Sequence, residues 1–356
     1  MVLSRLAAGW SAIRQLSTGK ADFKLPLAFV FDIDGVLIRG GAVLPQAREA
    51  MHILYQGADR PHFPLCFLTN GGGVTETTKA AELSHWLRVP VHESQVVLSH
   101  TPFRQLAEQY SQRPVLVAGR KQTADVALNY GFESAVTTCE LAAAFPHSVP
   151  FSLSVDGQAK PELPREGIGT ADKPIEAVML FTDPKEWYLD LQIIHDIITS
   201  GGVMGRPPSQ EHLGRVRLLF SNPDLLWSNE HPTGRFGQGA FRSALEALHS
   251  EVIGAPLANY KVYGKPNPEP YVLVEELLAK QAGLQQESTF GTIVAIGDNP
   301  KSDIAGATAA GRPWVSALVR TGVFQGGDND RQHPADLVVE DVLQAVTTAL
   351  DACKAS

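Results

Sequence analysis

The sequence is poor in cysteine, with only Cys66, Cys139 and Cys353 in a chain of 356 residues. The number is odd and no two of them are close in sequence, which argues against a disulfide framework or a zinc site. No apolar run approaches the ~18 residues that a membrane-spanning helix needs. Acidic residues outnumber basic ones by 38 to 30, which argues against a nucleic-acid partner. What remains is a globular protein, long enough for about two domains.

The first twenty residues differ in composition from the rest of the chain. They contain Arg5, Arg14 and Lys20, and no acidic residue precedes Asp22. Apolar residues recur at helical spacing, namely Leu3, Leu6, Trp10, Ile13 and Leu16. Basic amphipathic segments of this kind are typical of mitochondrial transit peptides. We therefore predict that residues 1–20 direct import into the mitochondrion, to its matrix. The alternative is an N-terminal extension without an address.

Both ends of the chain alternate between short apolar strands and helices. The N-terminal part predicts strands at 25–31 and 65–69 and helices at 46–55 and 76–87. The C-terminal part predicts strands at 292–297, 314–319 and 336–339 and helices at 268–280, 301–310 and 342–352. Apolar strands alternating with helices indicate an α/β fold, with a Rossmann-like parallel sheet covered by helices.

The middle of the chain has a strand and helix alternation of its own. It predicts strands at 115–118, 177–181 and 217–220, helices at 124–130 and 187–200, and glycine- and proline-rich loops at 146–174 and 201–214. A separate α/β unit between two matching ends indicates one domain inserted into another. We assign 21–101 and 237–356 to the core domain and 102–236 to an inserted α/β cap.

Asp32 and Asp34 directly follow the first apolar strand, in the segment Phe-Asp-Ile-Asp-Gly-Val-Leu. Side chains two residues apart on a strand point the same way, and a break at Gly35 would let both carboxylates converge on one cation. An Asp-x-Asp pair also arises by chance as a solvated strand end. The buried strand before it and the glycine after it favour the metal-binding interpretation.

A second acidic pair follows the predicted strand at 292–297. Asp298 comes directly after this strand, and Asp303 lies in the first turn of the next helix. A turn residue and a helix-capping carboxylate are the simpler explanations. Hard oxygen ligands that leave places for water and phosphate are, however, what Mg²⁺ needs.

Two further motifs suit the binding of an anion. The segment Thr69-Asn70-Gly71 and its two following glycines lie between a strand and a helix, where backbone amides approach anions. Lys265 stands between a glycine and a proline, so its ammonium group could neutralise a phosphate and a nucleophile together. A flexible turn and a surface lysine explain either motif alone. In open α/β sheets, however, ligands bind at the carboxyl ends of the strands, and all four motifs can share that edge.

In this order, the four motifs resemble those of the haloacid dehalogenase (HAD) superfamily. The segment between Thr69 and Lys265 resembles the large α/β C2-type cap of its class IIA, NagD-like group. Three segments are similar to a eukaryotic, often mitochondrial branch named after the cat eye syndrome critical region: Leu98–Pro102, Ser221–Trp227 and Arg235–Phe241. The resemblance covers the chain from Leu27 to about Leu350.

This resemblance implies a role for each motif residue. Asp32 would be the nucleophile that forms an aspartyl-phosphate, and Asp34 the general acid and base. Mg²⁺ would be bound by Asp32, Asp34, Asp298 and Asp303. The phosphate would be held by Thr69, Asn70, Gly71 and Lys265. Dehalogenases lack the acid at Asp34 and transport ATPases have threonine there, so the resemblance favours a phosphatase.

The expected activity is therefore hydrolysis of a small phosphomonoester in the mitochondrion. One alternative is a phosphatase of a phospholipid intermediate, such as a phosphatidylglycerophosphate. Another is a catalytically silent binding or scaffold protein of the same fold. Asn222, Asp224, Trp227 and Arg235 lie where the cap returns to the core and are candidates for substrate contact. Equally, Asn222 and Asp224 could form a turn while Trp227 packs within the cap. The class IIA resemblance also implies a homodimer through the cap.

Overall fold

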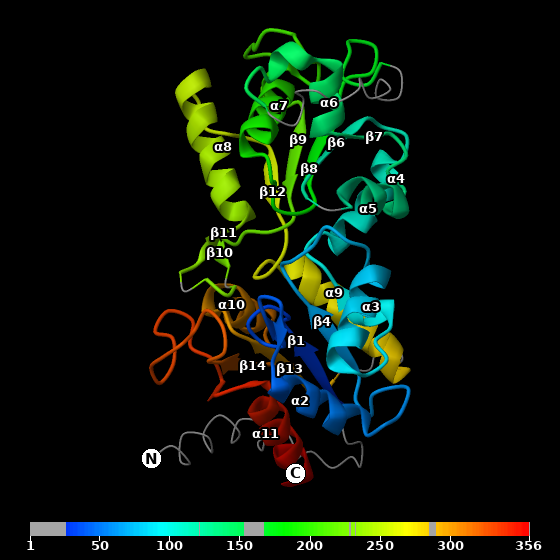
Figure 1. Ribbon diagram of the computed structural model, residues 1–356, viewed down its shortest axis with the longest axis vertical. Helices are drawn as coiled ribbons and strands as arrows, with labels where there is room; N and C mark the ends of the chain where they lie inside the picture. The colour runs from blue at the N-terminus through cyan, green and yellow to red at the C-terminus, as the bar shows by residue number, and fades with distance from the viewer. Residues whose placement is uncertain are drawn as a thin grey trace.

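The computed structural model of the chain describes residues 26–120, 122–152, 167–227, 229–231, 233–284 and 290–355. Within them the chain forms two α/β units, which lie one above the other in Figure 1. The core unit contains both ends of the described chain, and the cap unit comes from the middle. The predicted transit peptide at 1–20 and part of the predicted loop at 146–174 lie outside the described residues.

The core unit is built on a sheet of six parallel strands. From edge to edge the strands are β15 (Leu337–Val339), β14 (Trp314–Val319), β13 (Thr292–Gly297), β1 (Leu27–Phe31), β4 (Leu65–Leu68) and β5 (Val96–Val97). All residues of β1 are buried, as expected of a central strand with helices on both faces. The predicted α/β fold with a parallel core sheet is confirmed.

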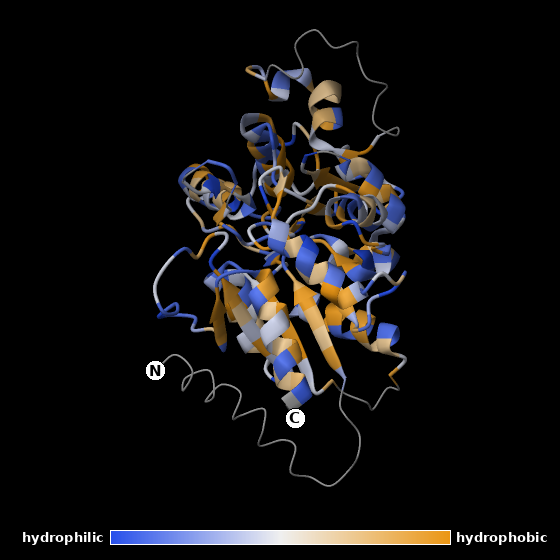
Figure 2. Cartoon of the chain, turned by 60° about the horizontal axis from the view of Figure 1, so that its bottom comes forward, coloured by the Kyte–Doolittle hydropathy of each residue, from blue (hydrophilic) through white to orange (hydrophobic). Residues whose placement is uncertain are grey.

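The helices of the core unit are α2 (Pro45–Tyr55), α3 (Glu76–Leu87), α9 (Pro268–Ala282), α10 (Ala305–Ala310) and α11 (Val342–Ala355). Alternate residues of β1 point to opposite faces of the sheet. Phe29 and Phe31 pack with the buried sides of α2 and α11, whereas Ala28 and Val30 pack with α9. The core strands are accordingly orange in Figure 2, and the helices around them show blue outer faces.

The cap unit has a second parallel sheet, of five strands. Its strands, in order, are β12 (Tyr260–Val262), β9 (Arg217–Phe220), β8 (Ala177–Leu180), β6 (Val115–Ala118) and β7 (Ala135–Thr137). One face packs against α6 (Thr138–Ala144), α7 (Trp187–Ser200) and α8 (Gln238–Ile253). The other face packs against α5 (Thr123–Tyr130). Each unit therefore has an apolar interior of its own.

Short elements complete the chain: α4 (Ala107–Tyr110), the 3₁₀ turns η1 (Glu93–Gln95), η2 (Thr101–Leu106) and η3 (Pro146–Ser148), and the π-helical turn η4 (Pro300–Ile304). Two antiparallel hairpins lie between the units. One is β2 (Ile38–Arg39) with β3 (Ala42–Val43), from the core, and the other is β10 (Leu226–Trp227) with β11 (Arg235–Phe236), from the cap. They meet where Glu230 Oε1 accepts a hydrogen bond from Gly41 N at 2.6 Å.

The cap extends further along the chain than the sequence predicted. β12 pairs with β9, and α8 contributes Phe241 and Leu245 to the apolar interior of the cap. The segment from Gly237 to Val262, assigned to the core from the sequence, therefore lies in the cap. The boundary was misplaced because neither α8 nor the short β12 was predicted from the sequence, whereas the motif at Lys265 follows directly after them.

No helix in the described part of the chain is both long and apolar enough to cross a membrane.

Gly306 tests how tightly α10 packs against α9. A Cβ atom at this position would lie 1.9 Å from Tyr271 Oη and 2.4 Å from Cζ, on the facing helix. We expect Gly306→Ala to destabilise the fold by about 1–3 kcal/mol, as overpacking does, despite the better helix propensity of alanine. Urea denaturation measures the change. The control is Gly326→Ala, where the added methyl group meets nothing within 4 Å. Equal stability of the two variants would contradict the packing.

Candidate active site

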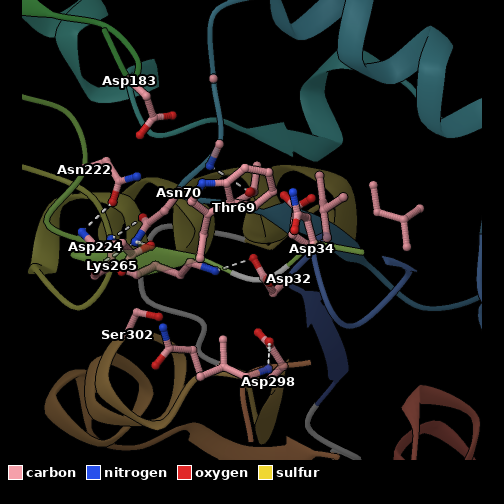
Figure 3. Close-up of a pocket in the computed structure, with 18 of the residues that line it drawn as sticks. Asp32, Asp34, Thr69, Asn70, Asp183, Asn222, Asp224, Lys265, Asp298 and Ser302 are labelled. Atoms are coloured by element: carbon pink, nitrogen blue, oxygen red, sulfur yellow. Dashed lines mark hydrogen bonds and ion pairs between the residues drawn. The ribbon is translucent and has the colours of Figure 1, made fainter. Parts of the chain in front are cut away.

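The order of the core strands brings the predicted polar motifs together. β13, β1 and β4 are neighbours in the sheet, and their carboxyl ends lead into Asp298, Asp32 and Thr69. Because the three strands are parallel, these residues meet at one edge. Lys265 arrives from the cap, after β12. Figure 3 shows its ammonium group directed at Asp32.

Lys265 is buried and bridges two of the acids. Its Nζ lies 2.6 Å from Asp32 Oδ1 and 2.6 Å from Asp303 Oδ1, and it donates to the carbonyl oxygen of Leu68 at 2.9 Å. Burial by itself would lower the pKa of Lys265, but Asp303 and Asp32 hold this pKa above its ordinary value. The lysine therefore stays charged beside Asp32.

Three buried carboxylates form a set that fits a divalent cation. One oxygen each of Asp32, Asp298 and Asp303 lie within 4.8 Å of one another. Burial raises the pKa of Asp32, and Asp303 and Asp298 raise it further against the opposing effect of Lys265. Burial and Asp303 raise the pKa of Asp298 to about 8. Such repulsion is relieved when a cation is shared among oxygen ligands. Asp34 also lines the cavity above this set.

Thr69, Asn70 and Gly71 lie at the same edge. The side-chain amide of Asn70 is hydrogen-bonded to other parts of the protein. Thr69 Oγ1 accepts from Gly71 N at 2.9 Å. Asn70 Oδ1 accepts from Lys265 N at 2.8 Å, and its Nδ2 donates to Lys265 O and to Asp224 Oδ2, both at 2.9 Å. Asn70 thus clamps the backbone of the lysine.

This clamp depends on Gly264, whose φ of +78° lies in the region that favours glycine. A Cβ there would lie 2.5 Å from the carbonyl oxygen of Ser221 and 2.8 Å from Asn70 Oδ1. A larger residue would therefore separate the lysine segment from the core.

His100, to which no role was assigned from the sequence, holds the glycine segment, Gly71–Gly73, in place. Its side chain is fully buried, and burial lowers its pKa to about 4, so the ring is neutral at physiological pH. Nε2 accepts from Gly73 N at 3.2 Å, and Nδ1 lies 2.8 Å from Tyr130 Oη. Since Nε2 is the acceptor, Nδ1 carries the proton and donates to Tyr130.

Tyr130 continues this chain of hydrogen bonds from the cap back to the core. It lies on α5 of the cap, and its hydroxyl donates to Glu76 Oε1 at 2.5 Å. Glu76 begins α3 and also accepts from Thr101 Oγ1 at 2.7 Å. The polar groups of this buried set are therefore paired, and the set joins the glycine segment, the cap and α3.

A cavity of about 390 Å³ lies between the cap and the edge of the core sheet where Asp32, Thr69 and Asp298 meet. Of the substrate candidates, Asn222, Asp224 and Trp227 line it. Asn222 and Asp224 also form the turn that was the alternative, because Asn222 Oδ1 accepts from Asp224 N at 2.7 Å. Arg235 is not among the lining residues, and its guanidinium group bonds to Thr233 and Gly234 within its own hairpin.

Besides Glu230 of the β10–β11 hairpin, two charged residues line the cavity from the cap that were not predicted from the sequence, Arg120 and Asp183. They follow β6 and β8, two strands that the sequence did predict. The rule that parallel strands bind ligands at their carboxyl ends, applied to the cap as it was to the core, would have found both.

Comparison with known proteins places the chain in a family. Residues 29–133 match the haloacid dehalogenase-like hydrolase family, and residues 262–345 match a HAD-hydrolase-like family. A protein of *Saccharomyces cerevisiae* named mitochondrial hydrolase is 37% identical over 346 residues, which are 91% of this chain and 96% of that one. This chain belongs to the haloacid dehalogenase-like hydrolases.

One further relative and one solved structure match this chain over a smaller share of their own length. A cardiolipin synthase (CMP-forming) / mitochondrial hydrolase fusion protein of *Schizosaccharomyces pombe* is 37% identical over 356 residues, which are 96% of this chain but 56% of the fusion protein. The structure of a glycerol phosphate phosphatase from *Mycobacterium tuberculosis* in complex with magnesium aligns with a TM-score of 0.58 at 18% identity, over 90% of this chain and 76% of that one. At this identity the likeness shows a shared HAD fold.

Replacing His100 tests its support of the glycine segment in this HAD hydrolase. His100→Phe keeps a ring but leaves Gly73 N buried without its acceptor, which costs about 1–3 kcal/mol. We expect this loss of stability in urea denaturation, together with weaker binding of inorganic phosphate in calorimetry. Tyr130→Phe is the control, because it retains the bond to Gly73. Unchanged phosphate affinity in His100→Phe would contradict the role.

The carboxyl group of Asp224 predicts a pH dependence of stability. Burial raises its pKa from 3.8 to about 7, so the folded protein holds a proton that the unfolded chain has released. The resulting stabilisation is complete below pH 4 and is lost as the pH rises towards 7. Relative to the wild type, the free energy of unfolding of Asp224→Asn should therefore rise by roughly 1–3 kcal/mol between pH 5 and pH 8. Denaturation at each pH measures this difference. The exposed Asp125→Asn is the control. If the difference in free energy of unfolding between Asp224→Asn and the wild type did not change with pH, the raised pKa of Asp224 would be refuted.

Proposed function

We propose that this hydrolase is a Mg²⁺-dependent phosphatase that cleaves a small phosphomonoester through an aspartyl-phosphate on Asp32. The observation that carries the proposal is the buried set in which Lys265 Nζ lies 2.6 Å from both Asp32 and Asp303, with Asp298 close by. Three carboxylates and one ammonium group leave two negative charges, which one divalent cation balances. The same set opens into the cavity of about 390 Å³, which provides space for a small ester.

In this mechanism Asp32 attacks the phosphorus atom, and the bond to the alcohol oxygen breaks. Asp34 donates a proton to the departing alcohol. Water then attacks the aspartyl-phosphate, Asp34 takes the proton from that water, and inorganic phosphate leaves. Lys265 orients Asp32 and offsets charge on the phosphoryl oxygens. Thr69 and the amide of Gly71 donate hydrogen bonds to the same oxygens, once Gly71 N leaves its contact with Thr69 Oγ1.

The metal would be held by Asp32, Asp298 and Asp303 and by the backbone carbonyl of Asp34. When bound, Mg²⁺ supplies the positive charge that lets a phosphate dianion approach a carboxylate. The roles of these residues are carried over from the superfamily resemblance and are supported by their convergence at one edge.

Relatives support a mitochondrial location, since two of them carry the name mitochondrial hydrolase. We propose the same compartment for this protein. Three further points are predictions only: import through residues 1–20, residence in the matrix, and a dimer formed through the cap. The neighbour named glycerol phosphate phosphatase supports a small phosphate ester as substrate.

A phosphomonoester on a phospholipid is the second candidate, because one relative is fused to a cardiolipin synthase. The two candidate substrates differ in whether the phosphate ester is dissolved in water or carried by a lipid in a membrane. A phosphatase of soluble esters hydrolyses them without vesicles, whereas a phospholipid phosphatase requires phosphatidylglycerophosphate in vesicles and leaves soluble esters intact.

The mechanism is tested with Asp32→Asn, which is nearly isosteric. We expect hydrolysis of phenyl phosphate in Mg²⁺ to fall by at least ~10³-fold, while the melting temperature stays within a few degrees of wild type. Removal of Mg²⁺ with a chelator should abolish wild-type turnover reversibly. The matched control is Asp125→Asn, an exposed aspartate on α5.

Two outcomes would count against the proposal. Full activity of Asp32→Asn would exclude this aspartate as nucleophile. Absence of Mg²⁺-dependent turnover by the wild type, on both soluble and vesicle-bound phosphomonoesters, would favour the catalytically silent scaffold.

A further inference from the structure

Exposed aromatic and aliphatic side chains gather on the cap beside the cavity. Phe236 is 71% exposed and lies opposite Leu226 in the β10–β11 hairpin, at the junction of cap and core (Figure 1). Its ring centroid lies 6.2 Å from that of Trp187, the first residue of α7. Tyr188 follows, and its ring centroid lies 5.9 Å from that of Phe151, which is 82% exposed. These five residues follow one another across the cap surface and are called the aromatic belt below.

The belt is anchored on the interior of the cap. The ring of Trp187 packs edge-on against Phe241, with centroids 5.5 Å apart, and Phe241 is fully buried. The hairpin is tied to the start of α8, because Gly237 N donates to Leu225 O at 3.0 Å. The outer rings are therefore held in water by a supported framework. Apolar area left in water costs free energy, and contiguous exposed apolar patches mark surfaces that bind a partner.

Two cations flank the belt. Lys185 is exposed and directly precedes α7, and Arg235 lies on β11. Neither forms an ion pair within the described part of the chain. The acids beside them are Glu186 and Glu230, and the carboxylate of Glu230 accepts from a backbone amide of the facing hairpin. Aromatic rings flanked by cations suit an anionic lipid surface.

The position of the belt favours a lipid surface over a protein partner. Leu226 belongs to the belt and also lines the cavity that contains Asp32. A surface that covers the belt therefore lies over one side of this cavity. A folded partner in that position would obstruct dissolved substrates, whereas a bilayer would bring phosphate groups of its own lipids. Tryptophan and tyrosine are also the side chains enriched where proteins meet the membrane interface.

We propose that the aromatic belt docks this protein on an anionic phospholipid bilayer, with the cavity facing the lipid headgroups. The docking itself does not depend on the catalytic mechanism. Its consequence for the substrate rests on the proposed phosphatase function: docking gives the second candidate, a phosphomonoester on a phospholipid, a route to Asp32.

Vesicle flotation tests the docking, with vesicles of phosphatidylcholine alone and of equal parts phosphatidylcholine and phosphatidylglycerol. We expect the full-length wild type to bind the anionic vesicles more tightly. Phe151→Ser/Phe236→Ser should lower the partition coefficient by at least ~10-fold, because two rings no longer leave water on docking. Lys185→Gln/Arg235→Gln should weaken binding to the anionic vesicles only.

The matched control is Leu128→Ser/Val272→Ser, which removes two exposed apolar side chains outside the belt. They lie on α5, on the other face of the cap sheet from α7, and on α9 of the core. This variant should bind vesicles like the wild type. All variants keep residues 1–20, so any contribution of that basic segment is common to them. Melting temperatures confirm that each variant is folded.

Hydrolysis separates the docking from the proposed function. Phe151→Ser/Phe236→Ser should hydrolyse dissolved phenyl phosphate at the wild-type rate, but phosphatidylglycerophosphate in anionic vesicles at least ~10-fold more slowly, since less protein is docked. Asp32→Asn should bind vesicles like the wild type, so vesicle binding tests the docking even if Asp32 is not the nucleophile.

Two results would overturn the docking and leave the phosphatase mechanism intact. One is equal partitioning of the wild type and Phe151→Ser/Phe236→Ser, or no binding of the wild type to either kind of vesicle. The other is a wild-type dimer in light scattering that becomes a monomer in Phe151→Ser/Phe236→Ser, since the belt would then be an interface between two copies of this chain.

Discussion

The ammonium group of Lys265 is the interaction on which the rest of the site depends. It bonds to Asp32, 233 residues away in sequence, and to Asp303. Burying these carboxylates together costs free energy unless positive charge is buried with them. Because Lys265 follows directly after β12, its two ion pairs lie at the point where the cap rejoins the core.

The cap is joined to the core by polar contacts around the cavity. Asn70 bonds to Asp224, Gln122 bonds to Gly73, and Glu230 bonds to Gly41. Each contact joins a cap residue to a core loop that lies beside the cavity. A displacement of the cap would therefore alter the segment from Thr69 to Gly73 as well as the walls of the cavity. The position of the cap and the position of these core loops are therefore set by the same hydrogen bonds.

Much of the fold could be predicted from the sequence, because apolar strands buried on both faces are easily recognised. β13 and β14 were predicted with accurate ends, and so were α3 and α7, whereas β1 ends at Phe31 as predicted but begins at Leu27. α8 and β12 were missed. α8 buries one face only, and β12 is three residues long and partly exposed. β12 belongs to the cap because it pairs with β9, and α8 because Phe241 and Leu245 pack into the cap interior. Both are long-range contacts that leave little trace in the local sequence.

The sequence by itself determined the chemistry at the core edge. Asp32, Thr69 and Asp298 each end a predicted strand, and parallel strands bring such residues to one edge in any fold of this class. Only the tertiary structure decided what lies opposite them. It brought Arg120 and Asp183 into one cavity, placed the side chain of Asn70 against the backbone of Lys265, and left Arg235 outside the cavity. The physical reason is that strand ends obey a local rule, whereas the cavity depends on how two separately packed units meet.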